Sequence, residues 1–353
     1  MTTLSTVRGS AGSAGAAEPA GRTPTEGRTL AESALREAVA ALPPSTALPS
    51  GYHFGWWDAA GQPSAGNAGK ALRPAFALAA AASMGGDRAA AVPGAVAVEL
   101  VHNFSLMHDD VMDGDATRRH RPTVWAVYGI DTAILAGDAL LAAAIEALAG
   151  SGHPAMVPAI RRLCAAVQAL IDGQAADLRF EQTTSVRLED ALAMASDKTG
   201  ALLGASCAVG ALLGGATAER AASMDRFGSL VGLAFQLVDD LLGIWGDPQV
   251  TGKPNHSDLR SRKKSLPVLA ALTSGTPAGR ELVTFYERES AFTDAELVRV
   301  AALIDEAGGR AWCIAHRDAL LHQASEALAA ASPTPEGAAE LTELARVATH
   351  RAY

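Results

Sequence analysis

The sequence is poor in the residues that mark disulfide-bonded, cysteine-ligated or nucleic-acid-binding proteins. Its 353 residues include three cysteines, which are far apart and odd in number, so they predict neither a disulfide framework nor a metal-ligand pair. A reducing, cytoplasmic setting is therefore expected. The net charge is −9, with 29 basic against 38 acidic residues, so the chain has no overall excess of the basic groups that nucleic-acid binding requires.

Long apolar runs are also scarce. The run at positions 201–216 has 16 residues and is rich in glycine, whereas a membrane-spanning helix needs about 20 apolar residues. The amino-terminal stretch is polar and lacks the apolar segment of a signal peptide. We therefore expect no membrane span, no signal peptide and no membrane partner.

Strand-forming patterns are missing as well, and the composition favours helices. Aromatic residues make up 5% of the chain, while alanine and leucine are abundant. Residues 1–27 contain mostly Gly, Ala, Ser, Thr and Pro and predict a disordered tail. Residues 28–353 predict a single all-α domain, a large helical bundle with a central cavity. The expected helices are 29–42, 70–84, 89–112, 132–149, 155–180, 188–213, 218–244, 264–272, 295–307, 310–331 and 337–351.

A pair of carboxylates ends an apolar helical stretch in the first third of the chain. Asp109 and Asp113 are four residues apart, so both carboxylates lie on one side of a helix, where like charges repel. Hard oxygen ligands suit Mg²⁺, which often bridges to phosphate. Arg118, Arg119 and Arg121 follow and supply guanidinium groups of the kind that bind phosphate. The pattern predicts a diphosphate–magnesium site; a solvated acidic helix end is the alternative explanation.

A second aspartate pair, Asp239-Asp240, also follows an apolar helical run, and basic residues again come after it. On its own, the basic run at 260–264 is typical of a solvated helix face. Because the arrangement occurs twice, we interpret the two acidic helix ends as opposite walls of one site. The basic residues are Lys253, Arg260, Arg262, Lys263 and Lys264.

Several short motifs stand in a fixed order along the chain. They read GKALRP at 69–74, ELVH at 99–102, RRHRPT at 118–123, DKTG at 197–200, FQLVDD at 235–240, GK at 252–253 and DLRSRKK at 258–264. With these motifs the sequence resembles the trans-isoprenyl diphosphate synthases, strongly over residues 66–272. The resemblance implies an isoprenoid synthase fold and a homodimer.

The resemblance also implies a reaction, the head-to-tail condensation of isopentenyl diphosphate with an allylic diphosphate. It assigns residues to the metals, to the two diphosphates and to the reaction centre. Metal ligands would be Asp109 and Asp113 for two Mg²⁺ ions, and Asp239 for a third. The allylic diphosphate would contact Arg118, Lys198 and Lys253, and isopentenyl diphosphate would contact Lys70, Arg73, His102 and Arg119. Thr199, Gln236 and Lys263 would line the reaction centre.

One of these assignments has a plainer alternative, and the chain departs from the family pattern twice. His102 taken alone would be read as a core histidine. The second aspartate motif has Gly243 where the family usually has a further aspartate, so metal binding on that wall is in question unless Asp247 compensates. Ala71 replaces a common arginine, which weakens the local positive charge.

Product length would depend on the helix that carries the first motif. Ser105 is small and Phe104 is bulky at the positions four and five residues before Asp109. In the family, bulk at the fifth position alone goes with a C20 product, so geranylgeranyl diphosphate is expected. The alternative is that Phe104 only packs against a neighbouring helix.

Two other functions stay open. A terpene cyclase on the same fold would not need the isopentenyl diphosphate residues Lys70, Arg73, His102 and Arg119. A non-catalytic partner subunit would have lost the first-motif aspartates or the phosphate-binding arginines. This chain has kept all of them, so the synthase is the preferred interpretation.

Overall fold

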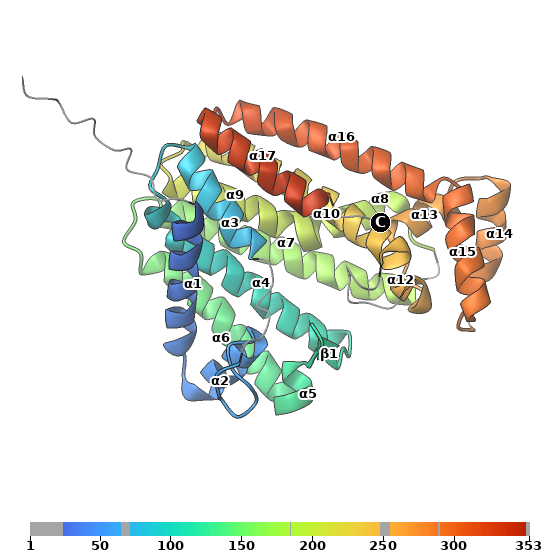
Figure 1. Ribbon diagram of the computed structural model, residues 1–353, viewed down its shortest axis with the longest axis horizontal. Coiled ribbons are helices and arrows are strands. Elements are labelled where there is room, and N and C mark those ends of the chain that lie inside the picture. The colour runs from blue at the N-terminus through green and yellow to red at the C-terminus, as the bar shows by residue number, and fades with distance from the viewer. Residues whose placement is uncertain (1–23, 65–70, 184, 248–254, 289, 351–353) are drawn as a thin grey trace, which may run out of the picture.

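The computed structural model describes residues 24–64, 71–183, 185–247, 255–288 and 290–350, and these form a bundle of long helices (Figure 1). The predicted tail falls outside the described residues up to position 23, and positions 24–27 belong to the first helix. Two predicted phosphate-binding residues, Lys70 and Lys253, also lie outside the described residues.

Helices account for most of the described chain, which confirms the all-α prediction. The only strands in the described ranges form a two-stranded antiparallel hairpin. In chain order the elements are α1 (Pro24–Ala40), α2 (Pro44–His53), α3 (Leu72–Ser83), η1 (Arg88–Ala91), α4 (Val92–Met112), β1 (Thr117–Arg118), β2 (Arg121–Pro122), α5 (Val124–Tyr128), α6 (Ile130–Ala149), α7 (Met156–Gln182), α8 (Leu188–Ala195), η2 (Ser196–Gly200), α9 (Ala201–Leu213), α10 (Ala218–Trp245), α12 (Ser257–Arg260), α13 (Leu266–Leu272), α14 (Pro277–Tyr286), α15 (Asp294–Glu306), α16 (Gly309–Ala330) and α17 (Pro335–Thr349).

Each predicted helix is present with shifted ends, and four short helices were missed: α2, α5, α12 and α14. No helix is expected directly after position 42, where two prolines follow, but in the structure Pro44 is the first residue of α2. A proline is well tolerated there because the N–H that it lacks has no partner within the first turn. The predicted helix 188–213 is interrupted by η2, a single π-helical turn.

Helix α9 lies at the centre of the bundle and packs against α3, α4, α7 and α10. Nearly all of its side chains are buried, and many are glycine or alanine, so neighbouring backbones approach closely. A Cβ atom at Gly210 would lie 2.0 Å from the carbonyl oxygen of Ala77 on α3. This close packing fixes α9, and therefore η2 at its amino-terminal end, relative to the other helices.

Three helical segments are long and apolar enough to cross a membrane by length and composition, namely 88–112, α6 and α10. They do not stand out in the sequence as uninterrupted apolar runs because charged residues lie within them. In 88–112 and α10, 72% and 67% of the apolar window is buried inside the protein, but in α6 the share is 33%. Helix α6 thus leaves much of its apolar surface uncovered.

The contact between α9 and α3 leads to a stability prediction. Gly210→Ala should destabilise the protein by about 1 to 3 kcal/mol, because the added methyl meets a backbone carbonyl that cannot rotate away. At Gly94 a Cβ would meet the side-chain ends of Val209 and Leu213, which can rotate. Urea unfolding of Gly210→Ala, with Gly94→Ala as the control, measures both effects. Equal unfolding free energies would contradict the role given to this contact.

Candidate active site

The first aspartate motif lies in the last turn of α4, and its three carboxylates differ in environment. Asp110 is 1% exposed, and its Oδ1 accepts a hydrogen bond from Arg118 Nε at 2.7 Å. Asp109 is half-buried and Asp113 is exposed. Burial raises the pKa of Asp109 to about 6, against the opposing effect of Lys198, and burial also raises the pKa of Asp113. The helix therefore presents two carboxylates that lack full charge compensation.

Lys198 lies opposite these carboxylates, on η2. Its Nζ donates a hydrogen bond to Asp177 Oδ2 on α7 at 2.6 Å. A π-helical turn often marks a functional site because it re-aims the side chains of a helix. Helix α7 approaches this turn closely at Gly173, where a Cβ atom would lie 2.5 Å from the backbone nitrogen of Lys198. The glycine thus lets the turn sit directly against α7.

The second aspartate motif shows the same division between buried and exposed carboxylates. Asp240 is 4% exposed; its Oδ2 accepts a hydrogen bond from the backbone N–H of Leu266 at 3.0 Å. Asp239 is exposed. Gln236 Nε2 donates to Asp240 Oδ1 at 2.9 Å, and its Oε1 accepts a hydrogen bond from Thr199 at 2.8 Å. This chain of hydrogen bonds connects the second wall to η2.

Lys263 completes the electrostatic connection between the two walls. Its Nζ lies 3.9 Å from Asp240 Oδ1. The nearby carboxylates raise its pKa far above the usual range and outweigh the opposing effect of desolvation, Asp240 and Asp258 most strongly, followed by Asp177 and Asp239. Lys198 thus lies near the carboxylates of the first wall and Lys263 near those of the second, and Asp177 interacts with both lysines.

The hairpin of β1 and β2 follows the first motif and carries Arg119 in its turn. Arg119 and His120 form the two-residue turn, with φ angles of 51° and 62°. Left-handed backbone at both positions is typical of Asn-Gly turns and is strained for these residues. Arg121 Nη1 donates to the backbone oxygen of Tyr52 at 3.0 Å, so this arginine anchors the hairpin.

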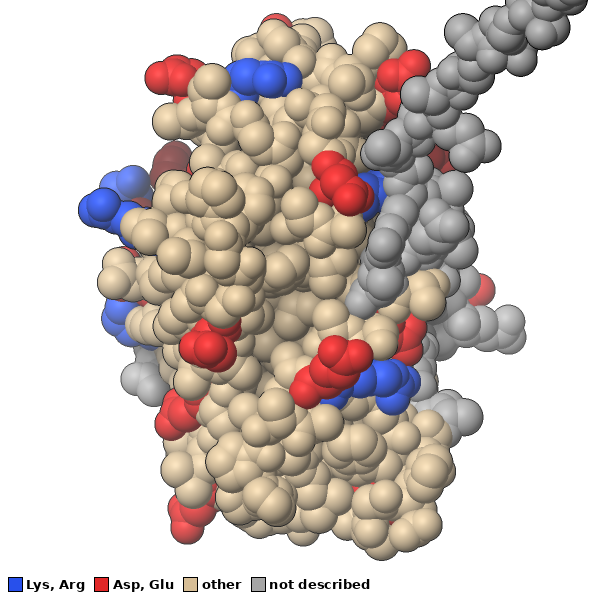
Figure 2. Space-filling view, turned by 90° about the vertical axis from the view of Figure 1, so that its left-hand side faces the viewer, with Lys and Arg blue, Asp and Glu red and all other residues tan. Residues whose placement is uncertain are grey.

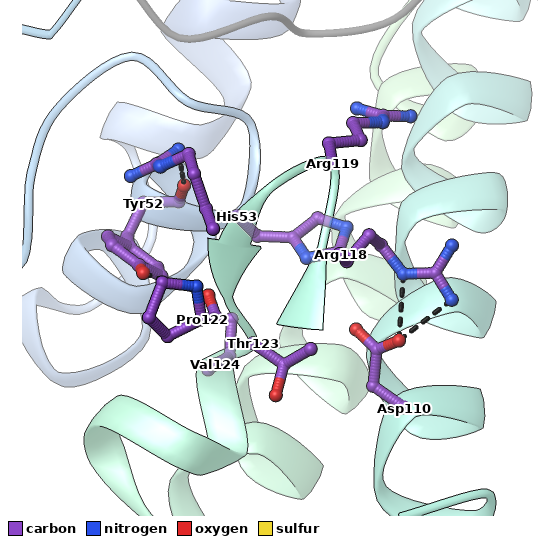
Figure 3. A pocket seen from close by; sticks show the side chains of 9 residues that line it. Tyr52, His53, Asp110, Arg118, Arg119, Pro122, Thr123 and Val124 are labelled. Carbon is purple, nitrogen blue, oxygen red and sulfur yellow. Dashed lines mark hydrogen bonds and ion pairs between the residues drawn. The ribbon is translucent and has the colours of Figure 1, made fainter. Parts of the chain in front are cut away.

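A small pocket that opens to solvent lies between α2, the end of α4 and the hairpin (Figure 3). Figure 3 shows the imidazole of His53 beside Arg118, which in turn reaches Asp110. The Nε2 atom of His53 is buried and has no hydrogen-bond partner. The lining residues are Tyr52, His53, Asp110, Arg118, Arg119, Arg121, Pro122, Thr123 and Val124.

Buried charged groups lie behind this pocket. Arg73 and Glu99 are close enough for each to oppose the effect of burial on the other's pKa. Asn103 Nδ2 donates to Glu99 Oε1 at 3.1 Å. Burial, followed by the positive charges of Arg73 and Arg119, places the pKa of His102 well below its usual range. The predicted isopentenyl diphosphate residues Arg73, His102 and Arg119 thus lie in one neighbourhood.

The proposed chain-length residues are buried in α4. Phe104 is 5% exposed and Ser105 is 6% exposed. The ring of Phe104 meets that of His108 edge to face, with 5.1 Å between their centres. Ser105 donates a hydrogen bond to the backbone oxygen of His102 at 2.8 Å. Both therefore belong to the helix interface behind the aspartate motif.

Sequence reasoning missed three residues of this site: His53, Gln174 and Asp177. Gln174 is 4% exposed, and its Nε2 lies 3.4 Å from Asp113 Oδ1. A polar residue on the buried face of α7 was the signal that could have revealed it, with Asp177 nearby on the same helix. His53 gave no such signal, because its helix was read as a loop.

The donor atoms fit magnesium in company with a diphosphate. In the described part of the chain, no three carboxylate, imidazole or thiol groups converge tightly enough to enclose a metal ion by themselves. Mg²⁺ is usually bound by one or two carboxylates together with substrate phosphates and water. Asp109, Asp113 and Asp239 offer accessible oxygen ligands of this kind. A metal ion at these residues would take its remaining ligands from a phosphate group and water.

Comparisons with known proteins agree with this geometry. A family model described as polyprenyl synthetase matches residues 56–303. A (2E,6E)-farnesyl diphosphate synthase of Mycobacterium tuberculosis is 47% identical over 320 residues, 90% of this chain and 89% of that protein. A geranylgeranyl diphosphate synthase of the same organism is 49% identical over 276 residues, 78% and 79% of the two chains. A polyprenyl synthetase structure from Streptomyces coelicolor A3(2) is 48% identical with a TM-score of 0.89, covering 92% of this chain and 98% of that one. The chain belongs to the polyprenyl synthetase family and is a trans-prenyltransferase.

Proposed function

We propose that this trans-prenyltransferase uses Mg²⁺ to condense isopentenyl diphosphate with an allylic diphosphate and releases geranylgeranyl diphosphate. The observation that supports it best is that each acidic helix end has a lysine close to its carboxylates, Lys198 at the first and Lys263 at the second. This arrangement offers metal ligands and ammonium groups to one diphosphate. The allylic primer would be dimethylallyl, geranyl or farnesyl diphosphate.

The reaction begins with heterolysis of the allylic C–O bond, whose electron pair leaves with the diphosphate. Lys198 and Arg118 stabilise the departing negative charge together with Lys253. Mg²⁺, held by Asp109, Asp113 and Asp239, would neutralise part of that charge. The double bond of isopentenyl diphosphate attacks the allylic carbon, and a diphosphate oxygen takes the proton that is lost. No side chain acts as a nucleophile.

The pocket beside the hairpin suits the diphosphate of the second substrate. Arg118, Arg119 and Arg121 line it with His53, and Arg73 and His102 lie behind it, with Lys70 as a further proposed ligand. Burial and the neighbouring guanidinium groups lower the pKa of His53 to about 3. The imidazole is therefore neutral, and an anion would find a pocket in which arginine supplies the positive charge. A terpene cyclase would have no use for this second anion site.

The neutral His53 leads to a pH prediction for the ligand-free protein. An imidazole with pKa 6.5 when unfolded and about 3 when folded binds its proton only in the unfolded chain between those values. The contribution of the neutral His53 imidazole to the free energy of unfolding is therefore fully present above pH 6.5. It is lost as the pH falls from 6.5 towards 3. From pH 7 to 4.5 the wild type should lose about 2 to 3 kcal/mol more than His53→Gln.

Urea unfolding at both pH values measures this difference. His322→Gln serves as the control, because His322 is exposed on α16. Parallel pH curves for wild type and His53→Gln would show that the imidazole does not stay neutral in the folded protein.

Product length is proposed from the wall behind the first motif. The curated relatives include a farnesyl and a geranylgeranyl diphosphate synthase at nearly equal identity, so overall similarity does not separate C15 from C20. Phe104 and Ser105 lie one turn before Asp109 on α4, where a growing prenyl tail would pass. A small serine beside one bulky phenylalanine supports the C20 product.

We expect a C20 diphosphate as the final product when purified protein, Mg²⁺ and isopentenyl diphosphate are incubated with each allylic primer. Mass spectrometry of the products makes the measurement. A C15 end product would keep the chemistry and remove the chain-length argument. A hydrocarbon or alcohol formed without isopentenyl diphosphate would instead indicate a terpene cyclase. If no substrate is turned over, a non-catalytic partner subunit becomes the preferred interpretation.

Two substitutions on α4 test whether Phe104 and Ser105 limit product length, one by removing bulk and the other by adding it. Phe104→Ala should lengthen the main product, because it removes bulk behind the motif. Ser105→Phe should shorten it to C15, because it adds a second ring. An unchanged product length in both variants would show that this part of α4 does not limit the length of the prenyl chain.

We also propose that the enzyme is a homodimer formed through α6 and α7. In the described ranges, six of the nine exposed large apolar side chains lie on these two helices, which pack against each other. Exposed apolar clusters of this kind mark interaction surfaces. Figure 2 shows one face of the molecule, on which basic and acidic side chains are intermixed and form no continuous basic patch. The six residues are Ile130, Ile134, Leu135, Ile145, Val157 and Ile171.

Leu135→Asp should convert a dimer into a monomer. The side chain is 61% exposed, so the change adds a charge to the proposed interface without disturbing the core of the protomer. Val298→Asp on α15, where the valine is 62% exposed, is the matched control and should leave the dimer intact. Light scattering coupled to gel filtration distinguishes the two, and a wild-type monomer would rule out the dimer.

A further inference from the structure

The two acidic helix ends differ in one carboxylate. On α4, Asp109 and Asp113 are one helical turn apart and face the same side. On α10, Asp239 occupies the place of Asp109, but the residue one turn later is Gly243. If both walls hold metal in the same way, the second wall lacks a carboxylate on its own helix.

The space at Gly243 is filled by a carboxylate from another segment. A Cβ atom at this position would lie 2.3 Å from Oδ2, 2.4 Å from Cγ and 2.6 Å from Oδ1 of Asp258. The acid group of Asp258 thus occupies the volume in which a side chain at residue 243 would begin. Gly243 is buried and Asp258 is half-buried, so the carboxylate fills this place and keeps some access to solvent.

The segment around Asp258 is fixed to the end of α10. Ser257 Oγ lies 3.3 Å from both the Gly243 backbone oxygen and Asp258 Oδ1. The backbone N–H of Lys263 donates to the Asp258 backbone oxygen at 2.8 Å. Arg262 binds the following segment to the end of α14 through hydrogen bonds to the Phe285 and Tyr286 carbonyls. These contacts hold Asp258 in register with residue 243.

The charges around Asp258 are those of the diphosphate site. Asp258 and Asp239 both raise the pKa of the Lys263 ammonium, so both carboxylates lie in the field of the same cation. Asp258 also adds to the raised pKa of the buried Asp240. Asp247 was the substitute considered from the sequence, but it lies beyond the end of α10 at Trp245.

We propose that Asp258 supplies the carboxylate that α10 lacks at residue 243, so that Asp239 and Asp258 together face the metal–diphosphate complex from the second wall. This inference rests on the proposed function. Gly243 is then required, because any side chain there would displace the Asp258 carboxylate. The second motif is complete in space although it is incomplete in sequence.

The test moves the carboxylate between the two positions. Asp258→Asn keeps the shape and should raise the Mg²⁺ concentration for half-saturation about 10-fold, the size of effect expected for groups supporting a metal site. Gly243→Asp alone should also impair binding, because two acid groups then compete for one volume. The double variant Gly243→Asp with Asp258→Gly should recover most of the lost affinity.

Calorimetric titration of Mg²⁺ in the presence of inorganic diphosphate gives the affinity without turnover, and thermal unfolding of each variant reports folding. Asp247→Asn is the matched control and should leave the affinity unchanged. Wild-type affinity in Asp258→Asn, a loss in Asp247→Asn instead, or no recovery in the folded double variant would each overturn the inference. If the wild type itself binds no Mg²⁺ with diphosphate, the proposed function fails before this inference is tested.

Discussion

The burial of carboxylates near the ends of α4 and α10 is the constraint on which the rest of the site depends. Burial raises the pKa of Asp109 to about 6, so the fold holds acid groups where their ionised forms are costly. Lys198 and Lys263 offset part of that cost and connect the walls through Asp177 and Asp240. The remaining deficit of positive charge is the condition under which a metal–diphosphate complex binds favourably.

Each aspartate pair divides its work between structure and binding. The second residue of each pair is buried and hydrogen-bonded: Asp110 to Arg118, and Asp240 to Gln236 and the first turn of α13. The first residue of each pair is more accessible. Because the buried partner is fixed by its hydrogen bonds, the backbone that carries the accessible carboxylate beside it is held in place. A pair of adjacent aspartates can therefore support a site that neither residue would form alone.

The sequence predicted the helices, both aspartate motifs and most of the cationic residues, because these follow from helical periodicity and from short ordered motifs. It missed α2 and hence His53, since a proline that starts a helix looks like one that ends it. It also missed Asp258 as a neighbour of Gly243, because that contact joins a helix end to a separate short helix. Contacts between distant segments leave no periodic signal, and the contact of Asp258 with Gly243 is of this kind.

Local structural rules are broken mainly where the site is built. The turn Arg119-His120 adopts left-handed backbone without glycine, η2 interrupts a helix with a π-turn, and Arg73 and Glu99 are buried together. Each feature is unfavourable by itself and persists because the surrounding packing over-determines it. The rigid contact of α9 with α3 supplies such packing for η2. The close packing of small residues at the centre of the bundle therefore holds in place the unfavourable local structure of η2.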